Sequence, residues 1–204
     1  MGIISNGTTI LDAGAIDSGV ATGKMTLIKT LTASNSATLS FVHGSDSVVF
    51  DSTYDSYVFK IINIHPETAS YFQVNFRDGG SSYDASKTSS SIKAQHRENG
   101  TNGNLEYRPA EDLVDSTSPQ VLTLDIGTEN DGCGSGELKF FDPSDTTFVK
   151  HFWSKMSYLY GTNYSMVSYV QGYCTATTAI DGVQFSMVSD NIMTGQIKLY
   201  GIGG

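Results

Sequence analysis

Aromatic side chains that could stack on sugar rings gather in the last third of the sequence. Trp153, Tyr158, Tyr160 and Tyr164 lie close together there, and the apolar face of a pyranose ring packs well on such rings. Tyr and Trp are also enriched at protein interfaces, because one end of each ring is apolar and the other can stay in water. We expect Trp153 and Tyr169, which lie in strand-like runs, to be core residues, and most of the others to serve the core or an interface. A glycan platform at Tyr158, Tyr160 and Tyr164, in a predicted loop, is the alternative.

Residues 129–132, Glu-Asn-Asp-Gly, are the segment that could bind a metal ion. They bring several oxygen atoms into a tight loop, and oxygen is the ligand atom that calcium prefers. Their spacing differs from that of the EF-hand loop, so we prefer a Gly-rich turn without a metal. No other cofactor is predicted.

The residue types needed for catalysis are present, but they do not form a catalytic motif. The sequence has no G-x-S-x-G nucleophile motif, and none of its four histidines has the spacing of a metal ligand. Carboxylate pairs such as Asp78 and Asp84 lie in turn-like sequence, where Asp is favoured for its local hydrogen bonds. A glycosidase needs two carboxylates across a groove, and the sequence gives no sign of such a pair. We therefore expect a protein that is not an enzyme.

Composition narrows the choice of partners. The formal net charge is −9, which disfavours binding to phosphate backbones and to anionic membrane surfaces. The sequence has no apolar run of about 20 residues and no secretory signal, so we expect a protein that is made in a cytosol and does not insert into membranes. Cys133 and Cys174 are then expected to be free thiols rather than a disulfide bond.

Strand-like runs alternate with turns from residue 25 onward. In residues 180–202, Val183 and Phe185 share one face of a first strand, and Ile197 and Leu199 share one face of a second. Residues 57–64 are apolar on both faces, which predicts a central strand. The remaining predicted strands are residues 25–31, 37–42, 47–50, 71–76, 121–126, 137–141, 148–153 and 165–171.

The turn signals complete this pattern. Asp78-Gly79 predicts a hairpin with a type I′ turn. Residues 80–118 are the most polar part of the chain and are predicted to be exposed loops, with at most one helical turn at residues 109–114. At 204 residues, with 21 Gly and only 4 Pro, the chain suits one all-β domain of many short strands.

The predicted fold is a single antiparallel β-sandwich of jelly-roll type, at residues 25–204, with an extended N-terminal arm. The arm is residues 1–24, which hold five glycines among small polar residues and show no sustained periodicity. We expect this arm to dock on a larger assembly or to contact another copy of the chain.

Three segments resemble jelly-roll structural proteins of tailed bacteriophages. The final strand, from Gly195 to Ile202, is similar to a G-x-I-x-L-Y-G-I closing strand. Residues 78–84 are similar to a "DGG-S-x-D" hairpin, and residues 136–147 to a "G-E-hydrophobic-x-hydrophobic-x-D-P-S" strand and turn. These segments occur in the order that the family has, from about residue 74 onward.

This resemblance implies a non-enzymatic structural protein on the exterior of the virion. It is compatible with a tail appendage that faces the host and with a decoration protein on the head. The implied partners are copies of the same chain, as a trimer, and other virion proteins, with host surface glycan as a further partner. The alternative function is a carbohydrate-binding module that recognises host polysaccharide.

Overall fold

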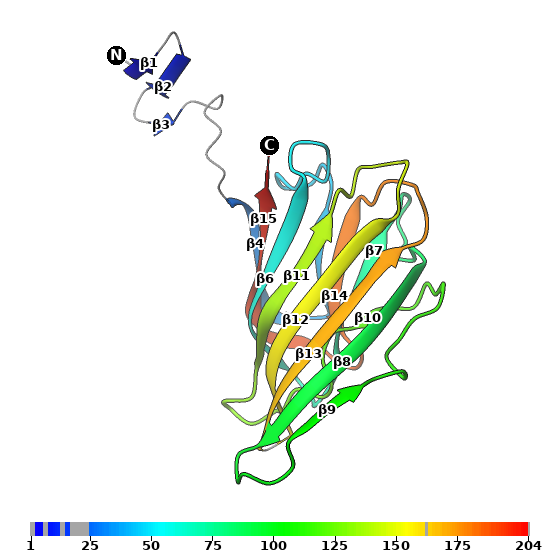
Figure 1. Ribbon diagram of the computed structural model, residues 1–204. Helices are drawn as coiled ribbons and strands as arrows, with labels where there is room; N and C mark the ends of the chain where they lie inside the picture. The colour runs from blue at the N-terminus through cyan, green and yellow to red at the C-terminus, as the bar shows by residue number, and fades with distance from the viewer. Residues whose placement is uncertain (1–2, 6–7, 13–14, 17–24, 162, 204) are drawn as a thin grey trace.

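The computed structural model describes residues 3–5, 8–12, 15–16, 25–161 and 163–203. All the regular structure in these residues is β-strand, and the strands form sheets of eight, four and three strands. Figure 1 shows the eight-stranded sheet in front, with β7 and β14 of the four-stranded sheet behind it. The predicted all-β, sandwich-like architecture is therefore confirmed.

Neighbouring strands of the eight-stranded sheet are all antiparallel. β6 lies between β15 and β11, so the segment that is apolar on both faces is a central strand, as predicted. In spatial order the strands are β4 (Thr26–Ser36), β15 (Ile192–Ile202), β6 (Ser56–Pro66), β11 (Gly134–Phe141), β12 (Lys150–Tyr160), β13 (Tyr164–Cys174), β8 (Lys87–Arg97) and β9 (Asn104–Tyr107).

The four-stranded sheet is also antiparallel and covers part of the inner face of the larger sheet. Beside it, Leu122, Leu124 and Ile126 extend the cover as buried residues of an irregular segment. The amide of Leu122 donates to the carbonyl of Phe72 at 2.8 Å, which fixes this segment against the sheet. The strands of this sheet in spatial order are β10 (Gln120–Val121), β7 (Phe72–Arg77), β14 (Gly182–Met187) and β5 (Thr38–Val42).

Aromatic rings from both sheets form the core. Phe59 of β6 contacts Phe185 of β14 with ring centroids 5.3 Å apart, and Phe76 of β7 stacks on Phe140 of β11 at 4.9 Å. All four rings are fully buried, and burying one such side chain contributes about 1.5–3 kcal/mol. Val183 and Phe185 of β14 and Ile197 and Leu199 of β15 are also fully buried, so the period-two pattern predicted the inward-facing residues of these strands correctly.

The N-terminal residues contain strands that their sequence pattern does not predict. β1 (Ile3–Ser5), β2 (Thr8–Asp12) and β3 (Ala15–Ile16) form a small antiparallel sheet of their own. In the part of the chain that the structure describes, none of these strands joins a sheet of the sandwich. Residues 17–24 lie outside the described residues, so the role of residues 1–24 as an arm stays a prediction.

Several local predictions between residues 47 and 126 are wrong. Residues 80–118 are not only loops, because they contain the long strand β8 and the short strand β9. The turn after β7 is real, with Gly79 and Gly80 at φ values of 107° and 69°, but it is not a hairpin. β7 pairs with β14 and β10, whereas β8, the next strand along the chain, belongs to the other sheet.

Two further segments also differ from prediction. Residues 47–50 form no strand, although Val48 and Phe50 are buried in the core. Of residues 121–126, only Val121 lies in a strand. Both segments lie at or beyond the edge of the four-stranded sheet, where side chains are buried without a full ladder of backbone hydrogen bonds. Residues 109–114 form a turn and bends, as expected of a loop with at most one helical turn.

Candidate functional site

Tyr158 lies in the core and not in a loop, contrary to prediction. It is a residue of β12 and is only 4% exposed. Its hydroxyl accepts a hydrogen bond from the amide of Leu124 at 3.0 Å and lies 3.0 Å from the hydroxyl of Ser168. Burial raises the pKa of this phenol. A ring held in this way presents no face to a sugar, so Tyr158 is excluded from a glycan platform.

Tyr160 and Tyr164 also lie in strands rather than in a loop. They face each other across the end of the β12–β13 pair, with ring centroids 6.0 Å apart and nearly perpendicular planes. Both are half-buried against the core. The guanidinium of Arg97 lies 5.3 Å from the centroid of the Tyr164 ring. These two rings therefore close one end of the sandwich.

Trp153 lies on the other surface of β12. We call this surface the outer face, the side of the eight-stranded sheet that is turned away from the four-stranded sheet. The direct cross-strand neighbours of Trp153 are Lys139 on β11 and Gln171 on β13, and Ser90 on β8 follows in the same row. Directly opposed side chains have Cβ atoms about 4.5–5.5 Å apart. The register therefore places an ammonium and an amide on either side of the indole.

A second row on the outer face lies one alternation further along the strands. It contains Lys155, Tyr169, Ile92 and Tyr107, from β12, β13, β8 and β9 in turn. Tyr169 is 43% exposed, and the Nζ atom of Lys155 lies 5.6 Å from the centroid of its ring. A contact of this kind contributes about 0.5–1 kcal/mol at an exposed site. Tyr169 and Trp153 are thus on strands as expected, but they face solvent rather than the core.

A third row lies on the opposite side of Trp153. His151 on β12 is paired with Tyr173 on β13, and their ring centroids are 5.7 Å apart in an edge-to-face arrangement. On β11, the Nζ atom of Lys139 lies 4.8 Å from the centroid of the Phe141 ring. The outer face therefore presents aromatic rings in several adjacent rows.

Two hollows on the outer face adjoin each other at Trp153. Their volumes are about 620 and 420 Å³, and both are lined by Trp153, Gln171 and Ser90. Lys155 and Tyr169 line the larger hollow, and His151 and Tyr173 are among the residues that line the smaller one. We call the two hollows together the outer-face groove. Volumes in this range are typical of ligand sites in proteins.

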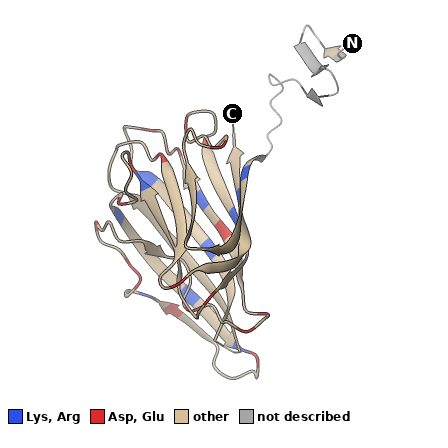
Figure 2. Ribbon diagram, turned by 180° about the vertical axis from the view of Figure 1, so that it is seen from behind, with Lys and Arg blue, Asp and Glu red and all other residues tan. Residues whose placement is uncertain are grey.

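Charged residues are segregated between loops and strands. In residues 25–161 and 163–203, every Asp and Glu except Glu106 and Glu137 lies outside the strands. In the same residues, every Lys and Arg except Arg108 lies within a strand. Figure 2 shows the carboxylates mainly in the loops at the ends of the sandwich and the basic residues along the strands. The negative net charge of the chain therefore does not extend evenly over its surface.

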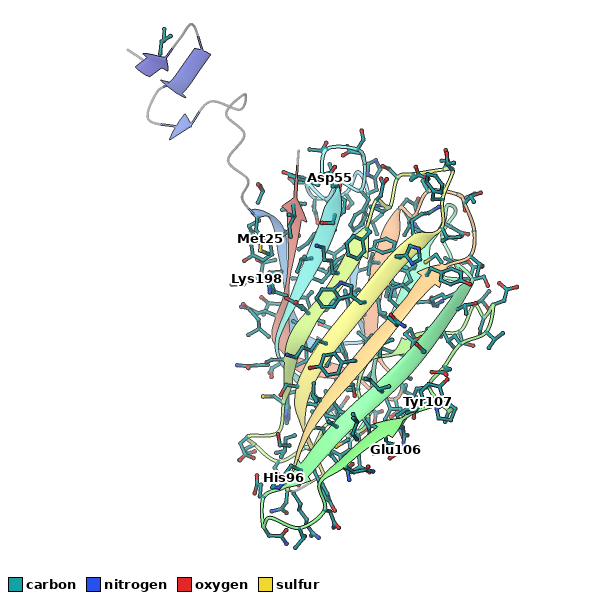
Figure 3. The ribbon with its side chains drawn as sticks, viewed as in Figure 1. Met25, Asp55, His96, Glu106, Tyr107 and Lys198 are labelled. Carbon is teal, nitrogen blue, oxygen red and sulfur yellow. The ribbon has the colours of Figure 1, made fainter. Side chains whose placement is uncertain are left out.

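Basic residues predominate on the outer face. The register sets Lys198, Lys60, Glu137 and Lys155 in one row across β15, β6, β11 and β12. Lys60 forms an ion pair with Glu137, and Lys139 lies two residues further along β11. Figure 3 labels Lys198 near one edge of the sheet and Tyr107 near the opposite edge. Four ammonium groups and one carboxylate thus face solvent around the aromatic rows.

The turn at residues 129–132 is closed by its own backbone. The amide of Gly132 donates to the carbonyl of Glu129 at 2.7 Å. Among the described residues, no group of three His, Cys, Asp or Glu side chains comes together in a way that could hold a metal ion.

A row of buried polar residues lies at the end of the sandwich. Lys150, Cys174 and Lys87 are cross-strand neighbours on β12, β13 and β8, and all three are buried. The ammonium of Lys87 donates to Asn75 Oδ1 at 2.5 Å and to the carbonyl of Ala85 at 2.8 Å. Burial lowers the pKa of Lys87 to about 8 and raises that of Cys174 to about 12. Both cysteines are free thiols.

Comparison with known proteins assigns no family to this chain. No family model matches the sequence, and no curated protein matches it. None of the residues that the structure describes form a helix long and apolar enough to span a membrane. The outer face combines stacking surfaces, ammonium groups and hydrogen-bonding amides. This chemistry suits non-covalent binding.

Proposed function

We propose that the sandwich is a jelly roll, in which one long antiparallel hairpin is folded over on itself. The nested order of strand pairs supports this proposal. β4 pairs with β15, β5 with β14, β6 with β11 and β7 with β10, from the outermost pair to the innermost along the chain. Folding such a hairpin gives sheets of order β4-β15-β6-β11 and β5-β14-β7-β10. β8–β9 and β12–β13 are then insertions that widen one sheet. Jelly rolls are common in viral capsid and lectin domains.

We further propose that the protein is a non-enzymatic structural component on the exterior of a tailed-bacteriophage virion. The observation that carries this proposal is the position of the segment that resembles the phage family most. Gly195 to Ile202 lies within β15, the last strand of the nested hairpin, and β15 is hydrogen-bonded on both sides, to β4 and β6. A second resembling segment, residues 136–147, begins in β11, whose partner β6 is also the partner of β15. These two segments thus lie in or begin in the strands on either side of β6, whereas the third, residues 78–84, lies in the turn after β7.

The copy number of the chain in purified particles tests this function. We expect the protein to be present in washed particles of a phage that encodes it. Its copy number is measured by quantitative mass spectrometry relative to the major capsid protein. A copy number close to that of the capsid protein indicates head decoration, and a few copies per particle indicate a tail appendage. Absence from washed particles overturns the proposal.

Self-association is part of the same proposal. The partners are other copies of the chain, assembled as a trimer, and neighbouring proteins of the virion, with assembly in the host cytoplasm. Native mass spectrometry of the purified full chain should give a trimer. A monomer at every concentration overturns the trimer, but it leaves the location on the particle to be decided by the copy number.

A further inference from the structure

We propose that the outer-face groove binds an acidic polysaccharide, a chain of sugars that carry carboxylates. This site is independent of the place of the protein in a virion, because it is built entirely from strands of one sheet. Three features of the groove support it: its charge, its exposed rings and its shape.

The outer face around the groove has an excess of positive charge, opposite in sign to the net charge of the whole chain, and of its charged residues Lys155 and Glu137 line the larger hollow. Lys139 and Lys155 flank Trp153 directly, one across the β11–β12 pair and one two residues along β12. Lys60 and Lys198 extend the positive charge towards β15. Among the described residues, Glu137 is the one carboxylate in these rows, and its ion pair with Lys60 leaves Lys139 and Lys155 available to a ligand. The loops carry the other carboxylates, so an acidic chain is drawn to the strands and repelled by the ends of the sandwich.

The exposed rings provide the surface for sugar stacking. Trp153 and Tyr169 are diagonal neighbours on adjacent strands, because Trp153 pairs with Gln171 and Tyr169 lies two residues before it. Diagonal positions of this kind are about 7–8 Å apart, so two rings can contact successive sugars of one chain. Aromatic side chains contribute a large contact area at little cost in conformational entropy.

The shape of the groove favours a chain over a single sugar. The hollows of about 620 and 420 Å³ meet at Trp153, Gln171 and Ser90, and each has room for at least one sugar ring. Polar groups that can bind sugar hydroxyls lie where the two hollows meet. The amide of Gln171 contacts Ser90 Oγ at 3.4 Å, a long hydrogen bond that a hydroxyl can replace, and His151 lies at the far end. A polymer that spans both hollows would contact both aromatic rows.

Nucleic acid is the other polyanion to consider. Its bases can also stack on exposed aromatic rings, and its phosphates are anionic like the carboxylates of a polyuronate. A polyuronate differs because every sugar ring carries free hydroxyls that the amide of Gln171 and the hydroxyl of Ser90 can bind, whereas the deoxyribose rings inside a DNA strand have none. We therefore expect single-stranded DNA to bind more weakly than a polyuronate.

Isothermal titration calorimetry of the full chain with polygalacturonate tests the proposal. We expect binding at an ionic strength of about 0.05 M that weakens strongly at about 0.5 M, because salt screens exposed charges. Trp153→Ala should reduce affinity about tenfold, which corresponds to about 1.4 kcal/mol. The double variant Lys139→Gln/Lys155→Gln should also bind more weakly and should lose most of the salt dependence. Dextran, a neutral glucan, should bind much more weakly.

Two matched variants control for general effects. Phe148→Ala removes an exposed aromatic ring in the loop before β12, and Lys29→Gln removes a lysine from the edge strand β4. Both should bind polygalacturonate as the unmodified protein does. Circular dichroism checks that every variant is folded, and the lysine variants replace solvent-facing groups, so at least one informative variant folds.

Four results overturn the proposal. The first is no heat of binding with polygalacturonate at low ionic strength. The second is equal binding of dextran, and the third is tight binding of single-stranded DNA without binding of polygalacturonate. The fourth is a loss of affinity in the groove variants that is no larger than in Phe148→Ala and Lys29→Gln.

Discussion

Residues of the same type have very different environments in this sandwich, depending on the face of the sheet on which they lie. Two lysines on the same strand show the contrast, because Lys155 is exposed on the outer face whereas Lys150 is buried on the inner face. Lys150 donates to the carbonyls of Phe148 and Ala176, and Lys87 is held in the same way by Asn75 and Ala85. A buried ammonium that has hydrogen bonds but no carboxylate partner is costly, so these lysines lose protons more readily than exposed ones.

The pH dependence of stability should reveal Lys87. Its pKa is about 8 in the folded protein, below the value of 10.5 for an unperturbed lysine. The unfolded chain therefore binds more protons between these values, and the free energy of unfolding rises with pH. From about pH 8 to about pH 9, the free energy of unfolding in urea should rise by about 1 kcal/mol more in the unmodified protein than in Lys87→Met. The buried thiol of Cys174 acts in the opposite direction in both proteins, in this interval and above it, because its pKa is raised from 9.0 to about 12.

The exposed residue Lys155 provides the control for this measurement. Lys155→Met should keep the rise of the unmodified protein, because the ammonium of Lys155 lies at the surface. If Lys87→Met gains as much stability as the unmodified protein over this pH interval, Lys87 is not the titrating group.

The sequence shows which aromatic residues could form a site, but it does not show directly whether each of them faces solvent or the core. The aromatic residues between 153 and 173 were predicted to serve the core or an interface, with Trp153 and Tyr169 in the core, whereas Trp153 and Tyr169 face solvent and Tyr158 is buried. Whether a given ring faces solvent depends on its position in the alternation of a strand, and Trp153 and Tyr158 have opposite positions on β12. The predicted strand ends at Trp153 and Tyr158 is predicted to lie in a loop, whereas β12 continues to Tyr160. The alternation of this longer strand places the two rings on opposite faces.

At the scale of elements, the close neighbours of β15 explain why this strand contains Gly195 and Gly201. Gly195 has a φ value of +127°, and a Cβ atom there would lie 2.8 Å from the carbonyl oxygen of Asn63. The register of β15 against β6 shifts on both sides of Thr194, so this glycine lies in an irregularity of the strand. Near the other end, the ring of Tyr54 packs directly on Gly201. A central strand with close neighbours on both sides has no room for side chains at these two positions.

Replacing Gly201 with alanine should destabilise the sandwich. The new Cβ atom would lie 2.4 Å from the ring of Tyr54, which itself packs edge-on against Tyr57 with centroids 5.8 Å apart. The ring must move, so we expect the free energy of unfolding in urea to fall by about 1–3 kcal/mol. Gly103→Ala, in an exposed loop with ordinary backbone dihedrals, should change stability by less than about 0.5 kcal/mol. Equal stabilities of the two variants would contradict the packing argument.

β8 shows why part of the fold could not be predicted from hydrophobic alternation. Its inward-facing residues include Lys87, Ser91 and Lys93, all buried and all polar. Much of this strand faces loops rather than the four-stranded sheet. The backbone amide of Arg108, for example, donates to the carbonyl of Ser91 at 2.8 Å, and the backbone amide of Ser91 donates to Asp112 Oδ1. A strand that packs on polar backbone and side chains has no apolar stripe, so its sequence resembles that of a loop.

At the scale of the whole molecule, the fold separates charge by geometry. Turns favour Asp for its local hydrogen bonds, and the turns of a sandwich lie at its two ends. On the outer face of a strand, the long aliphatic stem of lysine can cover the sheet while its ammonium stays in water. The nested hairpin therefore yields acidic ends and a basic, aromatic outer face without any change in the net charge. The −9 of the whole chain disfavours polyanions in general, and only the arrangement of strands reveals a face that suits one of them.

Removing residues 1–24 tests how the N-terminal region relates to this molecule. β1, β2 and β3 form their own sheet, so the sandwich should keep its thermal midpoint within about 3 °C when they are absent, because little of its buried surface is lost. Differential scanning calorimetry measures this directly.

The same truncated protein, produced in cells infected by a phage that lacks its own copy, should no longer be incorporated into particles. A truncated sandwich that unfolds shows that these residues are part of the domain. A stable one that is still incorporated shows that they are not the docking segment, and the contact must then be made by the sandwich, where the acidic ends become the next surface to test.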